Sequence, residues 1–213
     1  IIIVYDEEDH SDLKLINKIK NRDKRIKLIV NKKSLGAGRS RNIGIKKSRA
    51  RYIAFLDADD LWKNDQGKLQ LKCMTKNDLK ISHTTYEILK ENQKTRKIMK
   101  AKIFKDYKKL LISCNIGLST VMLKKSLITK NCKFPKLKTK EDFVLWLLIL
   151  KKNVIIGALD KNLTTWRKLN NSLSSSLLQK LKDGFSLYNR YMKFSFLKSF
   201  YYLAILSVNF LRK

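Results

Sequence analysis

Residues 52–62 read YIAFLDADDLW, an apolar run that leads into three aspartates. Five apolar residues followed by acids are typical of a buried strand that carries carboxylates at its carboxyl end. In open α/β sheets, ligands bind at that end of the strands. Asp57 and Asp59 are two residues apart, so in extended chain both side chains point to the same side. This stretch therefore predicts a sheet edge at which two carboxylates face one ligand.

The segments before this strand alternate between buried strands and helices. Apolar runs at 1–5 and 26–30 predict two strands, and apolar residues spaced by three over 12–22 predict a helix between them. A glycine-containing turn at 35–38 precedes a basic helix that ends near Ser48. Strand, helix, strand, helix and strand in this order predict an α/β fold with a mostly parallel sheet and flanking helices.

The second half of the chain has a less regular pattern. A buried helix is predicted from Thr139, because eight apolar residues at 143–150 lie between an acidic and a basic pair. The absence of a Gly/Ser linker favours one α/β domain over 1–170 and a helical tail over 171–213. We expect further helices at 65–76 and 106–112, paired strands at 80–90 and 96–104, a strand at 119–124, and two short strands within 154–166.

The composition is strongly basic, with 48 Lys and Arg against 18 Asp and Glu and a formal net charge of +30 at pH 7. Such a charge favours nucleic acid or an anionic membrane as a partner. The lysines are spread along the chain together with many Ile and Asn, however, which favours a genomic bias over nucleic-acid binding. Three cysteines without a Cys-x-x-Cys pair exclude a disulfide scaffold and a cysteine-based zinc site, and they suit a reducing compartment.

The scarce acids are clustered, since eleven of the eighteen lie at 6–12, 57–65 and 141–142. In a chain this basic, the clusters indicate local sites that hold a cation or accept a proton. Paired carboxylates suit Mg²⁺ or Mn²⁺, with the remaining ligands supplied by phosphates and water. A structural interpretation stays open for the second cluster, in which Asp60 caps the following helix.

Two further segments also allow two interpretations. The glycine turn and the arginines that follow it, over 35–42, suit an anion at a helix N-terminus or a plain tight turn with solvated arginines. Residues 139–142, TKED, fit the [ST]-x-x-[DE] capping box, so Asp142 is either a helix-capping residue or a catalytic one. The two roles are compatible, because a helix N-terminus favours an ionised carboxylate.

Several of these segments resemble the family 2 glycosyltransferases, which have the GT-A, nucleotide-diphospho-sugar transferase fold. The most specific are LGAGRSRNIGI at 35–45 and RYIAFLDADDLW at 51–62. Three others occur in the family's order: IIIVYDE at the start, TKEDFVLW at 139–146, and TTWR at 164–167 followed by NSLS at 171–174. The last pair is similar to branches that build bacterial capsule, O-antigen and teichuronic acid. The resemblance also implies that the family's first strand and helix are missing before Ile1, so an inactive fragment stays an open alternative.

The resemblance implies a role for each candidate residue. Asp6 would hydrogen-bond the nucleobase, Arg41 would help to hold the nucleotide, and Asp57 would contact the ribose. Asp59 would bind the divalent cation, Mn²⁺ or Mg²⁺, that bridges the diphosphate. Asp142 would be the general base that deprotonates the acceptor hydroxyl. The implied reaction moves a sugar from a nucleotide-diphospho-sugar to a hydroxyl of a glycan acceptor, with inversion.

The expected acceptor is a lipid-linked glycan, which places the enzyme in the cytoplasm, peripherally at a bacterial inner membrane. The aromatic stretch at 194–211 is interrupted by charge and falls short of the ~20 apolar residues of a membrane span. It suits a helix in the membrane interface, and equally one that packs on the protein's own surface. Because Trp166-Arg167 lacks the Q-x-x-R-W pattern of processive synthases, a single transfer is expected.

Two other functions compete with this interpretation. A sugar-nucleotide nucleotidyltransferase of related fold would carry a glycine-rich phosphate loop near its start. A non-enzymatic basic module for membrane or nucleic acid would bind any polyanion regardless of Mn²⁺ and of the acidic clusters. The clustered acids favour the glycosyltransferase, and no nucleic-acid partner is expected.

Overall fold

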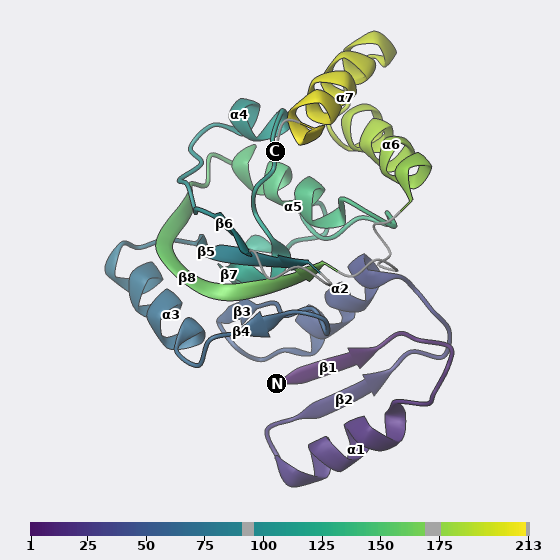
Figure 1. The fold of residues 1–213 in the computed structure, drawn as a ribbon, viewed down its shortest axis with the longest axis vertical. Helices are drawn as coiled ribbons and strands as arrows, with labels where there is room; N and C mark the ends of the chain where they lie inside the picture. Colours follow the sequence, from purple (N-terminus) through teal and green to yellow (C-terminus); the bar gives the residue numbers. More distant parts are fainter. Residues whose placement is uncertain (91–95, 169–175, 212–213) are drawn as a thin grey trace.

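The computed structural model describes residues 1–90, 96–168 and 176–211. Figure 1 shows a central curved sheet, a small two-stranded unit at one end and a helical hairpin at the other. The elements in chain order are β1 (Ile2–Tyr5), α1 (Leu13–Arg22), β2 (Lys27–Val30), α2 (Ala37–Lys47), β3 (Tyr52–Ala54), β4 (Leu61–Trp62), α3 (Gln66–Lys76), β5 (Ile81–Lys90), β6 (Arg96–Met99), α4 (Tyr107–Leu111), η1 (Leu118–Thr120), β7 (Val121–Lys124), η2 (Lys125–Leu127), α5 (Glu141–Leu150), β8 (Ile156–Lys168), α6 (Leu177–Ser186), η3 (Leu187–Tyr191) and α7 (Phe196–Leu211).

The described strands form two sheets. β1 and β2 pair in parallel, and the larger sheet has the order β3-β7-β5-β8-β4, with β6 on β5. The α/β class is confirmed, but the larger sheet is mixed rather than mostly parallel: only β5 and β8 run parallel in it. The apolar pattern of a buried strand does not report the direction of its neighbours, so the sequence could not reveal that β7 runs opposite to both β3 and β5.

β8 corrects the prediction of two short strands within 154–166. It is one strand that pairs with β5 from Ile156 to Lys168, with register shifts on either side of Thr85. The polar residues 160–162 resemble a turn in the sequence, but they lie at this irregularity, where extra residues of β8 are accommodated without ending the ladder. The predicted pairing of 80–90 with 96–104 is confirmed for β5 and β6, and the segment that joins them lies outside the described residues.

The core lies between the sheet and the C-terminal helices. α5 is the buried helix that its sequence predicts, and Trp146 and its neighbours belong to one hydrophobic core with residues of β5, β7 and η3. In Figure 1, α5 runs between the sheet and the α6–α7 hairpin. Two hydrogen bonds connect this hairpin to the α4 region. The Tyr188 hydroxyl donates to the Leu111 carbonyl, and Asn209 Nδ2 donates to the Ile112 carbonyl at 3.0 Å.

The C-terminal region is helical from Leu177, as predicted, but it folds back at 192–195 into two helices. The expected domain boundary near residue 170 and the NSLS motif lie outside the described residues. No helix of the described ranges is both long and apolar enough to traverse a bilayer.

Candidate active site

Arg41 of α2 connects two of the acidic clusters. Its Nη2 lies 2.8 Å from Asp57 Oδ1, just beyond β3, and its Nη1 forms an ion pair with Glu141, the first residue of α5. The guanidinium also lies over the Phe134 ring, 5.6 Å from its centroid. Burial opposes the charged form, but the carboxylates of Asp57 and Glu141 outweigh it and raise the pKa of Arg41. The Arg41 guanidinium thus joins the segment after β3 to the start of α5. Glu141 is 100 residues from Arg41 in the sequence.

A close approach of α2 and α5 makes this bridge possible. A Cβ atom at Gly38 would lie 2.7 Å from the Pro135 carbonyl oxygen and 3.2 Å from Cγ of Glu141. A larger residue would therefore force the first turn of α2 away from the start of α5. Gly38 therefore allows α2 and the start of α5 to pack closely.

The aspartates after β3 form a compact cluster. One oxygen from each of Asp57, Asp59 and Asp60 lies within 4.8 Å of the others. Asp60 is buried, and it accepts hydrogen bonds from Ser119 Oγ at 2.6 Å and from the Arg167 N–H at 3.1 Å. Burial, together with the charges of Asp57 and Asp59, raises the pKa of Asp60 to about 6. The two hydrogen bonds act in the opposite direction but are outweighed.

The expectation that Asp60 caps the next helix is wrong. α3 begins at Gln66, and Asp65 occupies its N-cap position. Asp60 is instead held against the sheet because the Ser119 hydroxyl, which donates to it, also accepts from the Asp57 N–H at 3.0 Å. This arrangement turns a buried carboxylate toward its two acidic neighbours.

The cluster fits a divalent cation. Three carboxylates supply the hard oxygen ligands that Mg²⁺ and Mn²⁺ prefer. Burial and, to a smaller extent, the charges of Asp57 and Asp59 raise the pKa of Asp60, and a cation would stabilise its ionised form. Among the described residues, none donates a hydrogen bond to the Asp59 carboxylate. The Arg167 side chain donates instead to the backbone carbonyl of Asp59. Its carboxylate is therefore the one best placed to serve as a ligand.

Asp142 is the second residue of α5, and its side chain is half-buried. Burial and the adjacent Glu141 raise its pKa to about 7, although Arg41 and a 2.7 Å hydrogen bond from the Phe143 N–H act in the other direction. Asp57 also contributes to this shift, so the charge of the aspartate cluster is felt at the start of α5. A carboxylate with a pKa near neutrality is suited to take up a proton under working conditions.

The capping-box interpretation of residues 139–142 is wrong. The N-cap of α5 is Lys140, in a left-handed conformation with φ of 63°, and its side chain makes no cap hydrogen bond. The Asp142 carboxylate does accept from the Phe143 N–H of the first turn, but without a capping box. The Thr139 hydroxyl donates instead to Asp183 of α6, at 3.0 Å. Asp183, which is distant in the sequence, thus binds the hydroxyl that a capping box would use to cap α5.

Asp6 is bonded to the segment before α2 rather than to the other candidates. Its carboxylate accepts from Asn31 Nδ2 at 2.6 Å and from the N–H groups of Leu35 and Gly36 at 2.9 and 2.8 Å. Although burial raises its pKa, these bonds outweigh burial and lower the value overall. Asp6 therefore holds the turn that opens α2, where Gly36 has a φ of 84°. Its contact with a nucleobase stays a prediction.

The structure adds site residues that the motifs do not single out. Glu141, adjacent to the candidate base, pairs with Arg41, and Ser119 and Arg167 position the aspartates. Tyr86 of β5 is buried nearby. Its burial raises the pKa of its hydroxyl, and the charges of Asp142 and Asp60 add to this shift. Arg167, within the TTWR motif, and Glu141, within the acidic pair at 141–142, carry a signal in the sequence.

The comparisons with known proteins establish the family of the chain. The model of Glycosyl transferase family 2 matches residues 1–129, and the chain therefore belongs to the family 2 glycosyltransferases. The family, the fold and the enzyme class that the motifs predict are confirmed.

Two relatives are similar to this chain in sequence, and one solved structure is similar in fold. WfgD of Escherichia coli, a UDP-Glc:alpha-D-GlcNAc-diphosphoundecaprenol beta-1,3-glucosyltransferase, is 35% identical over 178 residues, which are 83% of this chain and 69% of WfgD. TuaG of Bacillus subtilis, named for teichuronic acid biosynthesis, is 28% identical over 200 residues, 93% of this chain and 79% of TuaG. The structure of S. aureus TarS with UDP-GlcNAc superposes with a TM-score of 0.71 at 17% identity and covers 96% of this chain. This chain spans 61% of that TarS chain.

The Arg41 bridge makes a prediction about stability. Arg41→Ala leaves two carboxylates without their partner, so we expect the free energy of unfolding at neutral pH to fall by about 3 kcal/mol. Urea denaturation at neutral pH measures the effect. Arg39→Ala, which changes an exposed arginine of the same helix, is the control; equal losses in both variants would contradict a structural role for the bridge.

Proposed function

We propose that the protein transfers a sugar from a nucleotide-diphospho-sugar to a hydroxyl of a lipid-linked glycan, once per encounter, with inversion, and with the help of a divalent cation. The observation that supports this most directly is the Arg41 bridge. It links a carboxylate cluster suited to a cation with the helix that begins at Glu141 and Asp142. Family membership favours this reaction over the nucleotidyltransferase and over a non-enzymatic basic module.

The donor end of the site would be formed by the aspartate cluster and Arg41. Asp59, flanked by Asp57 and Asp60, would hold Mn²⁺ or Mg²⁺, whose positive charge offsets the negative charge that develops on the leaving diphosphate. Asp57, which Arg41 orients, would contact the ribose, and Asp6 would contact the base. The names of WfgD and of the TarS complex contain UDP-sugars, and for this reason we propose a UDP-sugar as the donor.

Asp142 would act at the acceptor end. Its ionised carboxylate takes the proton of the acceptor hydroxyl while the hydroxyl oxygen forms a bond to the anomeric carbon. The bond from that carbon to the diphosphate oxygen breaks on the opposite face, and its electron pair leaves with the nucleoside diphosphate. The raised pKa makes Asp142 a stronger base than an ordinary aspartate, provided that the pH is high enough to ionise it.

The cation site predicts metal-dependent nucleotide binding. In the full-length protein, we expect Asp59→Asn to weaken the Mn²⁺-dependent binding of UDP roughly tenfold or more, because it removes a ligand of the cation. Isothermal titration with UDP, in Mn²⁺ and in EDTA, measures this. Asp65→Asn is the matched control, since Asp65 is exposed and lies outside the cluster. UDP binding that is the same in Mn²⁺ and EDTA would count against the proposed site.

The candidate base predicts a pH dependence. We expect kcat/KM to rise with pH through about 7, because Asp142 must lose its proton before it can act. Asp142→Asn should lower kcat by about 10²-fold or more. Glu141→Gln removes the neighbouring negative charge that raises the pKa of Asp142, so the acidic limb of the profile should move to lower pH. An Asp142→Asn variant with the wild-type profile would refute the assignment.

Membrane contact is proposed for the outer side of the α6–α7 hairpin. Four neighbouring residues at the start of α7 are strongly exposed, from 49% to 81%, and we name them the aromatic patch: Phe196, Leu197, Phe200 and Tyr201. Lys198 lies among them, with its Nζ 4.7 Å from the centroid of the Phe194 ring. Aromatic side chains beside lysines match the interface of an anionic membrane. WfgD is named for an undecaprenol-linked acceptor, and a lipid-linked acceptor would place this enzyme at the cytoplasmic face of a membrane.

The division of the chain follows from this proposal. Residues 1–170 would form the catalytic domain, and residues 171–213 would form a tail that packs on α5 with one side and faces lipid with the other. The two sides are distinct, because the buried Tyr188 and Met192 belong to the core while the aromatic patch does not.

The aromatic patch predicts vesicle binding. We expect the full-length protein to float with vesicles of equal parts phosphatidylglycerol and phosphatidylcholine, and less so as salt increases. Leu197→Ser with Phe200→Ser should weaken this binding roughly tenfold or more, because two exposed apolar side chains no longer enter the interface. Leu15→Ser removes an apolar residue of α1 whose exposure lies between those of Phe200 and Leu197, and it serves as the control. Equal flotation of both variants would argue against the patch.

A further inference from the structure

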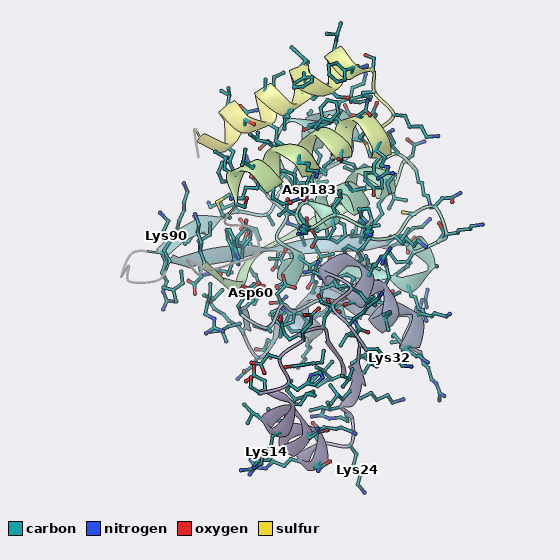
Figure 2. All side chains as sticks on the ribbon, turned by 90° about the vertical axis from the view of Figure 1, so that its right-hand side faces the viewer. Lys14, Lys24, Lys32, Asp60, Lys90 and Asp183 are labelled. Carbon is teal, nitrogen blue, oxygen red and sulfur yellow. The ribbon has the colours of Figure 1, made fainter. Side chains whose placement is uncertain are left out.

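A buried carboxylate of the tail is bonded to the turn that precedes the candidate base. Asp183 of α6 is 5% exposed, and its Oδ2 accepts from the Thr139 N–H at 2.8 Å and from the Thr139 hydroxyl at 3.0 Å. Thr139 itself is 7% exposed, so neither group has ready access to water as an alternative partner. Figure 2 labels Asp183 beside α6, on the side toward the centre of the molecule. The two hydrogen bonds fix both the backbone and the side chain of Thr139.

The residue that follows Thr139 also docks on α6. Lys140 adopts the left-handed conformation, and its aliphatic stem lies so near α6 that a Cβ at Gly184 would be 3.4 Å from its Cε atom. Burial lowers the pKa of Lys140, and the charges of Asp142 and Asp183 partly offset this effect. α6 therefore contacts the lysine stem at Gly184 and holds the threonine through Asp183, at adjacent positions.

These contacts determine where α5 begins. A left-handed residue turns the chain sharply, and the next two residues are Glu141 and Asp142. Glu141 reaches Arg41 and Asp142 is the candidate base, so the orientation of both depends on the turn that Asp183 holds. We propose that Asp183 is a positioning residue for the transfer reaction: by holding Thr139, it sets the position of Asp142. This inference rests on the proposed role of Asp142 as the general base.

The other polar contacts of the tail differ from this one. The bonds of Tyr188 to Leu111 and of Asn209 to Ile112 fasten η3 and α7 to the α4 region. Of the described tail residues, Asp183 is the one that accepts hydrogen bonds from the segment directly before α5. A buried carboxylate is costly unless it is well bonded, and apolar residues can hold helices together without that cost. A directional role at Thr139 accounts for an aspartate here.

The test compares two variants that both loosen the tail. Asp183→Ala removes the acceptor of Thr139, whereas Tyr188→Phe removes a tail hydrogen bond that does not involve residues 139–142. In the full-length enzyme, we expect Asp183→Ala to lower kcat roughly tenfold or more, with KM for the donor within about twofold of wild type. The acidic limb of its pH profile should move to lower pH, because Asp142 in a freed turn is better solvated. Tyr188→Phe should keep the wild-type profile.

Amide exchange measures the turn directly. Exchange of residues 139–144 should be faster in Asp183→Ala and unchanged in Tyr188→Phe. Asp183→Asn, which keeps an oxygen to accept from the Thr139 N–H, should restore most of kcat, and Lys182→Ala, on the exposed side of α6, should behave as wild type. If Asp183→Ala does not fold, Thr139→Val removes only the hydroxyl donor and should lower kcat and shift the profile in the same direction, with Thr139→Ser as its control.

Two results would overturn the inference, and they are separable. An Asp183→Ala variant that matches Tyr188→Phe in kcat, pH profile and exchange would show that Asp183 only fastens the tail. An Asp142→Asn variant that keeps its kcat would show instead that the proposed general base is wrong.

Discussion

The geometry of the site depends on one buried guanidinium. Arg41 contacts Asp57 on one side and Glu141 on the other, and its own side chain is 18% exposed. Buried ion pairs recover their desolvation cost only when the partners are well oriented, so the two carboxylates must be brought to it by the backbone. The packing of Gly38 against Pro135 allows that approach. A shift of either element would separate the aspartate cluster from the start of α5.

The charge distribution explains why this arrangement needs an arginine. The chain has a net charge of +30, but most of that charge is spread over exposed lysines and is screened by salt. Inside the site the balance is reversed, since the cluster after β3 and the acidic pair of α5 meet around Arg41. The pKa values of Asp60 and Asp142 are raised by burial and by neighbouring carboxylates. The excess of negative charge is what suits the site to a cation and a proton.

The sequence predicts the parts of this protein that are local. The apolar run before Asp57 indicates a strand, the all-apolar residues of α5 indicate a buried helix, and the clustered acids indicate where charge is concentrated. Strand direction, the continuity of β8 and the partner of Thr139 depend on contacts between distant segments, which periodicity does not encode. The capping-box motif failed because Asp183, 44 residues away, takes the Thr139 hydroxyl. Pairings of this kind become visible only in the folded chain.

The two sides of the α6–α7 hairpin differ in their surroundings and in their side chains. Its outer side exposes aromatic and leucine side chains that water solvates poorly, while its inner side places a carboxylate against the turn before α5. A hairpin held only by apolar packing could slide or rotate at little cost, since such contacts are not directional. The hydrogen bonds of Asp183, Tyr188 and Asn209 remove that freedom. A surface that seats the hairpin on lipid would therefore also hold the acceptor end of the site in a fixed position relative to the membrane.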